Sequence, residues 1–593
     1  MDAGSSENTA EITLTGSSSN PQMNCGFAPN ATSNVDEWGG FPRDIPNPGI
    51  VGDGQCNIFK SATNKTQTTT FACPSFSQKH REMASWQLFI IIIAFICLLV
   101  EAVSKPYYTV AVYEHNRYIN ASGSPKHIIN NNLAFYIKAA KIAKEKNADI
   151  IVYPEYGIFA PSQNRSKMRD FLEKIPDPAK VSTIPCEEQE TYSEMTILQI
   201  LSCIAKNNSM FIVANMGDIQ NCEGDPKCPS DGVFQFNTNV VFDREGRLIL
   251  KYHKEHLYFE LALDLAREQQ VPTFQTDFGN FATYTSFDVL FKRMSDIAHW
   301  PSIDAIMLTT MWAEFTPQIA SIQLWQSWAL ANNCTLVASN IQIPGYYAVG
   351  SGVFHGRNGA LAYTYNPDGI SKLVVARLPK RGHSFVPPNP ITIAITANHS
   401  FHFKNEGQHV TTDCSRTVLN DTTKIHEEYR CVEENTDGYL FKKLPGKSAH
   451  MELCHNGMCC ILDYTAKALT ENYYLGVYNG THNFFGRYFL EEENCLLVRC
   501  ESLDEKVCAI YPRTSKTVFH HVQLRANFST SFVLPTYLES GMKLVPKSEW
   551  SYEVVPSFGA YQARVNFKSQ KGRRLVTVGF KGRCFDRDPP YIR

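Results

Sequence analysis

Three polar side chains follow predicted strands, and together they provide a carboxylate, an ammonium group and a hydroxyl. Glu155 follows the predicted strand 148–153, and Ser286 directly follows the predicted strand 281–285. Lys254 lies just past a predicted hairpin. Acyl transfer requires a base, a positive charge and a nucleophile, and catalytic groups of open α/β sheets gather outside strand carboxyl ends. Any α/β protein also carries polar residues at strand ends, so the spacing alone leaves three unrelated positions as an alternative.

The elements that would position these residues alternate between β-type and helical segments. Helical patterns cover 134–146 and 196–206, and a turn at 243–246 joins two strands into a hairpin. Continuous apolar strands alternating with helices predict an α/β layer fold with a covered sheet. The predicted strands are 109–113, 148–153, 209–215, 238–242, 248–252, 281–285, 305–309 and 335–339.

The character of the chain changes after about residue 385. Four residues rich in proline, 387–390, interrupt the pattern, and the polar stretch 405–435 predicts a linker. Short alternating runs with many turns and cysteines follow, such as 473–478 and 518–524. We therefore predict an α/β domain at 105–385, a linker at 386–435 and a mainly β domain at 436–593.

The amino-terminal region carries a targeting signal. Basic residues precede the apolar run Leu88–Val100, and the small residues of 102–104 follow it, which is typical of a signal peptide at 83–104. A helix of this length rises about 20 Å, against roughly 30 Å of bilayer hydrocarbon. A signal anchor at 88–103 and a buried core helix are the alternatives, and membrane contact is expected only for the anchor.

Residues 1–82 are rich in Ser, Thr, Asn and Gly, which predicts disorder. This extension is either the cytoplasmic tail of a signal anchor or an over-extended start of the reading frame, and we favour the second. The carboxyl end, 588–593, lacks the apolar tail that a GPI-anchor signal requires. The expected location is therefore outside the cell, with a single-pass membrane protein as the alternative.

Cysteines and glycosylation sequons agree with this location. Of 18 cysteines, fourteen follow residue 180, and in a secreted chain such cysteines form disulfides. Sequons at Asn30 and Asn64, before the apolar run, show how readily the pattern arises by chance, and Asn333 is expected to be buried. The predicted glycosylation sites are Asn120, Asn164, Asn207, Asn398, Asn420, Asn479 and Asn527.

The charge of the chain gives no reason to expect nucleic acid as a partner. The formal net charge is −2, with 56 basic and 58 acidic residues. The spacing of Cys454, Cys459 and Cys460 is not that of a typical zinc site. We expect neither a metal nor another cofactor, and a small ligand or substrate as the partner.

From residue 107 onward, many segments resemble those of one protein family and occur in the same order along the chain. They are 111–115 (AVYEH), 150–155 (IIVYPE), 175–186 with its PDP core, 201–209 (LSCIAKNNS), 236–243 (FNTNVVFD), 252–260 (YHKEHLYFE), 350–352 (GSG), 459–460 (CC), 474–478 (YLGVY) and 486–488 (GRY). In these segments the chain resembles the vanin/biotinidase branch of the nitrilase, or carbon–nitrogen hydrolase, superfamily. The resemblance implies a four-layer α-β-β-α sandwich, followed by a smaller, mainly β, cysteine-rich domain.

The same resemblance implies roles for the residues at the strand ends. Glu155 matches the family's general base, Lys254 the lysine that stabilises the oxyanion, and Glu260 a second glutamate that orients this lysine. The nucleophile position falls on Ser286, because Thr285-Ser286-Phe287-Asp288 stands where the family has Thr-Cys-Phe-Asp. Amide hydrolysis of pantetheine or biotinyl type is the implied activity.

Other residues receive implied roles as well. Trp312 and Asp288 match positions of the substrate pocket. Cys334 is expected to be structural rather than a replacement nucleophile. Pairing is expected among four cysteines that match the family, Cys186, Cys203, Cys222 and Cys228.

The serine alters the expected chemistry. A cysteine with an ordinary pKa near 8.5 readily becomes a thiolate beside a lysine, whereas a serine hydroxyl is far less acidic. A neutral Lys254 could activate Ser286, but nearby carboxylates favour the charged lysine. The sequence therefore predicts a weakened or inactive amidohydrolase, with a catalytically silent extracellular binding protein as the alternative.

Overall fold

The computed structural model describes residues 106–120, 123–343, 348–365, 367–380, 383, 390–395, 433–484, 486–501, 508 and 511–591. All of them belong to one compact unit, Gln87–Arg593. The predicted extension 1–82 and the predicted signal segment 83–104 lie outside the described residues. Among the helices of the described segments, none combines the length and the apolarity that crossing a bilayer needs.

The first sheet carries the strand that precedes Glu155. Its central strands β1, β2 and β4 are parallel, and β4, β5 and β6 continue it as antiparallel neighbours. The order is β14 (Ile391–Ile395), β13 (Ser371–Pro379), β1 (Tyr107–Glu114), β2 (Ile150–Val152), β4 (Phe211–Asn221), β5 (Val233–Phe242) and β6 (Leu248–His253), with β3 (Leu172–Glu173) beside β4. Strand β14 therefore extends this sheet into the segment predicted as a linker.

The second sheet carries the strand that ends just before Ser286. Its central strands β8, β9 and β10 are parallel, so their carboxyl ends lie at one edge. The order is β12 (Gly359–Thr364), β11 (Ser351–His355), β10 (Thr335–Asn340), β9 (Ala305–Thr310), β8 (Gly279–Thr285) and β7 (Thr273–Thr276).

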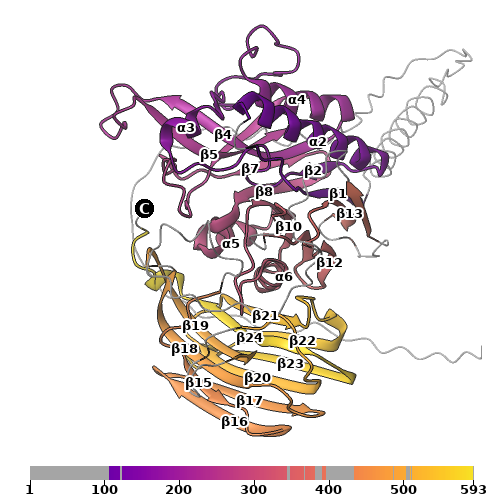
Figure 1. The fold of residues 1–593 in the computed structure, drawn as a ribbon, viewed down its shortest axis with the longest axis vertical. Coiled ribbons are helices and arrows are strands. Elements are labelled where there is room, and N and C mark those ends of the chain that lie inside the picture. The colour runs from indigo at the N-terminus through magenta and orange to yellow at the C-terminus, as the bar shows by residue number, and fades with distance from the viewer. Residues whose placement is uncertain are drawn as a thin grey trace, which may run out of the picture. The chain divides into compact units, whose positions relative to one another are not determined.

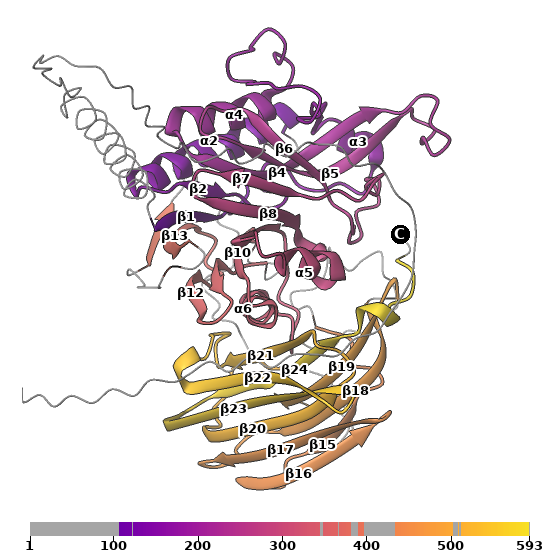
Figure 2. The same cartoon turned by 180° about the vertical axis from the view of Figure 1, so that it is seen from behind.

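The two sheets and their helices form four layers, as Figures 1 and 2 show. Helices α2 (Pro125–Glu145) and α4 (Thr196–Asn208) share one core with the outer face of the first sheet. Apolar side chains of both sheets, together with Phe278 in the turn between β7 and β8, form the core between them. Helices α5 (Lys292–Ala298) and α6 (Ser321–Asn332) cover the outer face of the second sheet. The predicted α-β-β-α sandwich is confirmed. The short helix α3 (Arg165–Arg169) contributes only Met168 to the cores of these layers.

The carboxyl-terminal domain is a sandwich of two antiparallel sheets with a common core that includes Phe567. This confirms the predicted mainly β domain. One sheet has the order β15 (Leu440–Lys443), β18 (Tyr473–Phe484), β19 (Tyr488–Arg499), β24 (Leu575–Arg583) and β21 (Val533–Glu539). The other has the order β16 (Ser448–His455), β17 (Met458–Ala466), β20 (Phe519–Phe528), β23 (Ala560–Arg573) and β22 (Trp550–Ser557).

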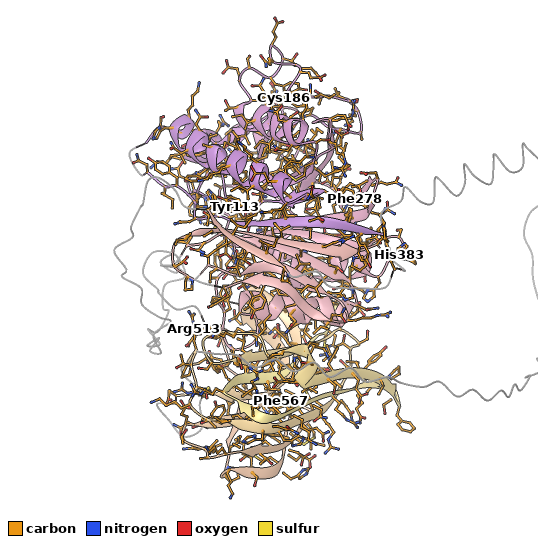
Figure 3. All side chains as sticks on the ribbon, turned by 90° about the vertical axis from the view of Figure 1, so that its right-hand side faces the viewer. Tyr113, Cys186, Phe278, His383, Arg513 and Phe567 are labelled. Atoms are coloured by element: carbon orange, nitrogen blue, oxygen red, sulfur yellow. A yellow bond between two sulfur atoms is a disulfide. The ribbon has the colours of Figure 1, made fainter. Side chains whose placement is uncertain are left out.

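Helix α6 joins the sandwich to the hydrolase layers. Its side chains share a core with residues of β21 such as Leu534 and Leu538, and Ser327 Oγ donates to Pro535 O (2.7 Å). Arg513, labelled in Figure 3, is buried at this junction and donates to the carbonyl of Glu314 (3.2 Å). Because α6 has a sheet on one side and the sandwich on the other, it is buried all round, polar residues such as Gln323 included, rather than amphipathic.

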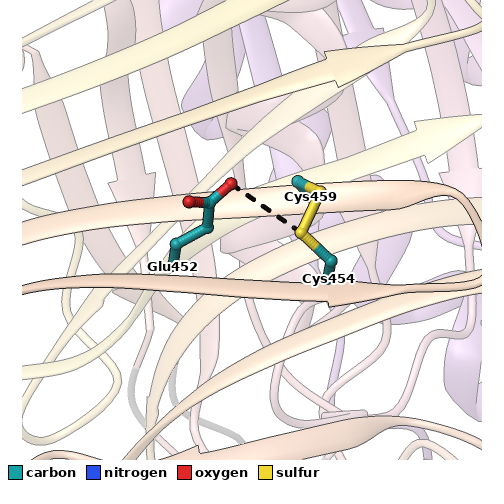
Figure 4. A group of neighbouring side chains, drawn as sticks. All are labelled: Glu452, Cys454 and Cys459. Atoms are coloured by element: carbon teal, nitrogen blue, oxygen red, sulfur yellow. Dashed lines mark hydrogen bonds between the residues drawn. A yellow bond between two sulfur atoms is a disulfide. The ribbon is translucent and has the colours of Figure 1, made fainter.

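Disulfides connect cysteines within both domains. The hydrolase layers hold Cys186–Cys203 and Cys222–Cys228, which are pairs among the four cysteines expected to bond. The sandwich holds Cys454–Cys459, Cys460–Cys495 and Cys500–Cys508. Figure 4 shows Glu452 beside the first of these. Since both sulfurs there are joined to each other, neither is a thiolate that could bind a metal.

Candidate active site

Glu155 lies just beyond β2 and is buried, with 2% of its surface exposed. Its Oε1 accepts hydrogen bonds from Lys254 Nζ (2.8 Å) and Asn237 Nδ2 (2.7 Å). Its Oε2 accepts from the backbone N–H of Met311 (2.9 Å), which follows β9. Strands of both sheets therefore fix the orientation of this carboxylate.

Lys254 lies just past β6 and is also buried, at 3% exposure. Its Nζ donates to Glu155 and to Glu260 Oε2 (2.7 Å). Asn237, on β5, donates from one amide nitrogen to both glutamates, with Glu260 Oε1 at 2.6 Å. Tyr156 donates its hydroxyl hydrogen to the same Glu260 oxygen. The structure thus brings together the three charged residues that the sequence singled out.

The charges of this cluster determine which group can accept a proton. Burial raises the pKa of Glu155, Lys254 opposes this, and the charge of Glu260 adds to it. Burial alone would lower the pKa of Lys254, but the charges of Glu155 and Glu260 outweigh it and raise this pKa above its usual value. The lysine therefore stays an ammonium at neutral pH, and Glu155 is the residue of the pair suited to accept a proton.

Ser286 directly follows β8 and begins the one-turn helix η1 (Ser286–Leu290), with φ at +45°. A left-handed backbone is costly for a residue with a Cβ, and such strain is concentrated at functional sites. The serine is 5% exposed, and its Oγ accepts a hydrogen bond from Thr310 Oγ1 (3.3 Å). Within the described residues, no hydrogen bond joins Ser286 Oγ to Glu155 or Lys254.

Asp288 fixes the turn that presents the serine. Its Oδ2 accepts from the Thr285 N–H (3.2 Å) and from the Tyr252 hydroxyl (2.9 Å). Its Oδ1 accepts from the backbone N–H of His256 (2.9 Å) and lies 2.8 Å from its Nδ1. The carboxylate therefore ties the turn after β8 to the segment 254–260, which we call the lysine loop. A direct contact of Asp288 with substrate stays a prediction.

Trp312 follows β9 and is buried among aromatic rings. Its backbone N–H donates to Asn340 Oδ1 (2.8 Å), and its indole N–H donates to Ile319 O (2.8 Å). The ring lies 5.8 Å from that of Phe315 and 5.5 Å from that of Trp325, measured between centroids. These contacts hold the ring rigidly beside Met311, whose N–H binds Glu155; its role in the pocket stays a prediction.

The carboxyl-terminal sandwich contributes to the lysine loop. Tyr488, at the start of β19, accepts a hydrogen bond from the Phe259 N–H (2.7 Å), where the loop has a positive φ of 51°. The Tyr488 ring stacks on Tyr258 with centroids 5.5 Å apart. Tyr591 donates its hydroxyl hydrogen to Leu257 O. The second domain therefore helps to set the conformation of the loop that carries Lys254.

Asn237, Tyr156, Thr310 and Tyr488 were not predicted as site residues. Asn237 lies in the FNTN segment, where three consecutive polar residues lie in a buried strand. Buried polar side chains in a strand are a signal of hydrogen bonding to something specific, so this residue was detectable. Nothing in the local sequence of Tyr488 indicates a contact with Phe259, which lies 229 positions away.

The predicted glycosylation sites differ in exposure. Asn164, Asn207 and Asn527 are exposed, and Asn120 and Asn479 are half-buried. Asn333 is exposed, so its expected burial was wrong. Asn398 and Asn420 lie outside the described residues. Cys334 is buried in the core beneath α6, in keeping with a structural residue.

A four-layer sandwich with a buried Glu–Lys–Glu cluster beside a strained strand-to-helix turn defines a carbon–nitrogen hydrolase scaffold. Residues 111–373 match the carbon–nitrogen hydrolase family, and residues 429–588 match the vanin C-terminal domain. The chain belongs to the vanin/biotinidase branch of this superfamily.

Curated relatives match across both domains. Human biotinidase is 31% identical over 503 residues, which cover 81% of this chain and 90% of that protein. Human pantetheinase is 31% identical over 452 residues, covering 74% and 83% respectively. Among solved structures, an amidase from Nesterenkonia sp. is 23% identical and covers 46% of this chain and 92% of its own, with a TM-score of 0.34.

Proposed function

We propose that this chain is an extracellular amidohydrolase relative that binds a small linear amide and hydrolyses it slowly or not at all. The observation that supports this is the combination of an assembled Glu155–Lys254–Glu260 cluster with a hydroxyl at the nucleophile position. The names of its relatives, biotinidase and pantetheinase, suggest biotinyl amides and pantetheine as substrates.

In a competent site of this geometry, the nucleophile at position 286 attacks the amide carbonyl and gives its proton to Glu155. Lys254 stabilises the negative charge on the carbonyl oxygen. Glu155 then passes the proton to the leaving amine as the carbon–nitrogen bond breaks. Water, deprotonated by Glu155, hydrolyses the acyl-enzyme and restores the nucleophile.

Serine makes the first step difficult for two reasons. The raised pKa of Lys254 keeps it charged, so it does not serve as the base of a Ser–Lys pair. Glu155 Oε1 already accepts two hydrogen bonds, and the serine hydroxyl is bonded to Thr310 instead. General-base catalysis contributes about 10²–10⁴-fold, and a serine that lacks it loses a comparable factor.

A catalytically silent binding protein is the second candidate. It is favoured by the same positive charge on Lys254, because an ammonium among buried carboxylates can hold a carbonyl oxygen without any reaction. The two candidates differ only in whether the acyl-enzyme forms.

Three forms of the chain test the proposal in one assay. The natural chain, Ser286→Cys and Ser286→Ala are secreted from the same host and assayed for hydrolysis of pantetheine and biotinyl amides. We expect Ser286→Cys to exceed the natural chain by at least about a hundredfold in kcat/KM. Turnover by the natural chain that Ser286→Ala abolishes would show a working serine enzyme. Inactivity of all three, with no amide binding by calorimetry, would refute the inherited pocket.

Secretion and glycosylation form part of the proposal. The five disulfides within the described residues suit an oxidising compartment. The exposed side chains of Asn164, Asn207 and Asn527 are accessible to glycosylation. Sequencing the amino terminus of the secreted product tests the processing step: a first residue at Lys105 supports a cleaved signal peptide, and an intact terminus supports an anchor.

A further inference from the structure

A cleft of about 760 Å³ lies apart from the catalytic cluster. It is bounded by α5, by residues 255–256 of the lysine loop, by residues 486–490 and by the terminal segment 585–591. None of Glu155, Lys254 and Ser286 lines it. Ligand sites commonly have volumes of roughly 300–1,000 Å³ and combine apolar walls with a few polar groups.

Stacked rings form one wall of this cleft. His256 lies flat on Phe291, with centroids 3.5 Å apart and an angle of 7° between the planes. Tyr591 meets both edge-on, at 5.2 Å and 5.5 Å. Tyr488 stacks on Tyr591 at 5.8 Å. Such a wall offers ring faces and edges to a flat aromatic ligand.

Most charged groups of the cleft are already paired. Arg293 is 3.3 Å from Glu255, and Lys292 is 2.6 Å from Asp586. Asp588 is 2.6 Å from Arg583. These pairs leave little charge to attract a ligand.

Arg487 is the exception. Its guanidinium lies 5.7 Å from the centre of the Phe259 ring, and among the described residues it forms no ion pair and its buried Nε has no hydrogen-bond partner. A buried donor without an acceptor is costly, and a guanidinium pairs best with a carboxylate or phosphate. Asp296, the remaining acid of the lining, is exposed to solvent on α5.

We propose that this cleft is a second binding site, for a small aromatic carboxylate or aromatic phosphate. The anionic group pairs with Arg487, and the ring packs on the wall formed by Phe291 and Tyr591. Neither of the predicted substrate-pocket residues, Trp312 and Asp288, lines this cleft, although His256 connects its wall to Asp288 and so to the turn that carries Ser286.

Calorimetry on the complete secreted chain tests the site with defined probes. Benzoate and phenyl phosphate are the two anions, and whichever binds more tightly identifies the anionic group. Benzamide, inorganic phosphate and benzyltrimethylammonium are the comparison ligands, which lack the charge, lack the ring or reverse the charge. We expect one or both aromatic anions to bind at least about tenfold more tightly than any of the three.

Variants locate the binding. Arg487→Met is expected to weaken the bound anion at least about tenfold, because it removes the charge and keeps much of the side-chain volume. Arg564→Met, on β23 and away from the cleft, is the matched control and should leave binding unchanged. Glu155→Gln should also leave it unchanged. Loss of binding in Glu155→Gln but not in Arg487→Met would place the anion in the catalytic site and overturn the proposal.

A measurement on the unsubstituted chain makes the test independent of folding of the variants. Phenylglyoxal modifies accessible arginines, and peptide mapping reports each site. The aromatic anion should slow modification of Arg487 and not that of Arg564. Absence of protection, tighter binding of the cation, or equal binding of inorganic phosphate would each overturn the proposal.

Discussion

Replacing Lys254 by methionine should destabilise the chain in a way that depends on pH. Lys254 Nζ is within 2.8 Å of both Glu155 and Glu260, and all three residues are buried. Removing one partner of a buried ion pair costs about 3–5 kcal/mol, because an uncompensated charge stays in the interior. Here two carboxylates would remain, and both would accept from the same Asn237 nitrogen.

The sign of the pH dependence follows from the remaining carboxylates. Without Lys254, their mutual repulsion and burial raise the carboxyl pKa in the folded chain above its value in the unfolded chain. The folded state then binds more protons than the unfolded state between these two values, so stability falls as pH rises through that window. We expect the full loss of about 3–5 kcal/mol at pH 8 and a smaller loss near pH 5.

The assay is denaturant unfolding of the natural chain and Lys254→Met at both pH values. The two chains should show equal slopes of unfolding free energy against denaturant concentration. Lys292→Met is the control, because Lys292 is half exposed and its pair with Asp586 lies at the surface. A loss below about 1 kcal/mol at pH 8, or a loss that is equal at both pH values, would refute the view that Lys254 neutralises a buried carboxylate pair.

Three further outcomes are expected. Tyr488→Phe removes the acceptor of the Phe259 N–H bond and should lower the free energy of unfolding, measured in denaturant, by about 1–3 kcal/mol. A change below half of the lower bound of this range would contradict the anchoring of the lysine loop. In a Ser286→Cys background, Asp288→Asn should lower kcat more than it raises KM, and equal effects on both would argue for substrate contact instead. Replacing Cys186 and Cys203 by serine opens a loop of 17 residues and should cost about 3 kcal/mol, read as a lower midpoint of thermal unfolding, whereas an unchanged midpoint would contradict it.

Elements with a clear period were predictable from the sequence. The uncharged run of β8 and the hairpin of β5 and β6 place Ser286 and Lys254 correctly, because a covered strand excludes charged residues and a tight turn needs glycine. Helix α2 begins at Pro125, well before the predicted start, since Ser124 caps it and its first turns are polar.

Elements whose surroundings are supplied by the other domain were not predictable. Helix α6 has no solvent-exposed face, because the sandwich covers the side that would otherwise contact water, so its apolar and polar residues follow no amphipathic period. The role of Tyr488 also depends on contact between the two domains. Its hydroxyl contacts the lysine loop only because the second domain folds against the first.

The serine and its surroundings impose different requirements on the sequence. Glu155, Lys254 and Glu260 depend on one another, because removing Lys254 leaves two buried carboxylates without a counter-charge, and removing either glutamate takes away one of the two carboxylates that hold the ammonium. Ser286 has no such dependence: its hydroxyl contacts Thr310, and the strained turn is held by Asp288 rather than by the side chain of the nucleophile. A change of nucleophile therefore alters catalysis with little effect on folding. The charged cluster would persist in a chain that has lost turnover, so its presence supports a preserved pocket and does not by itself support activity.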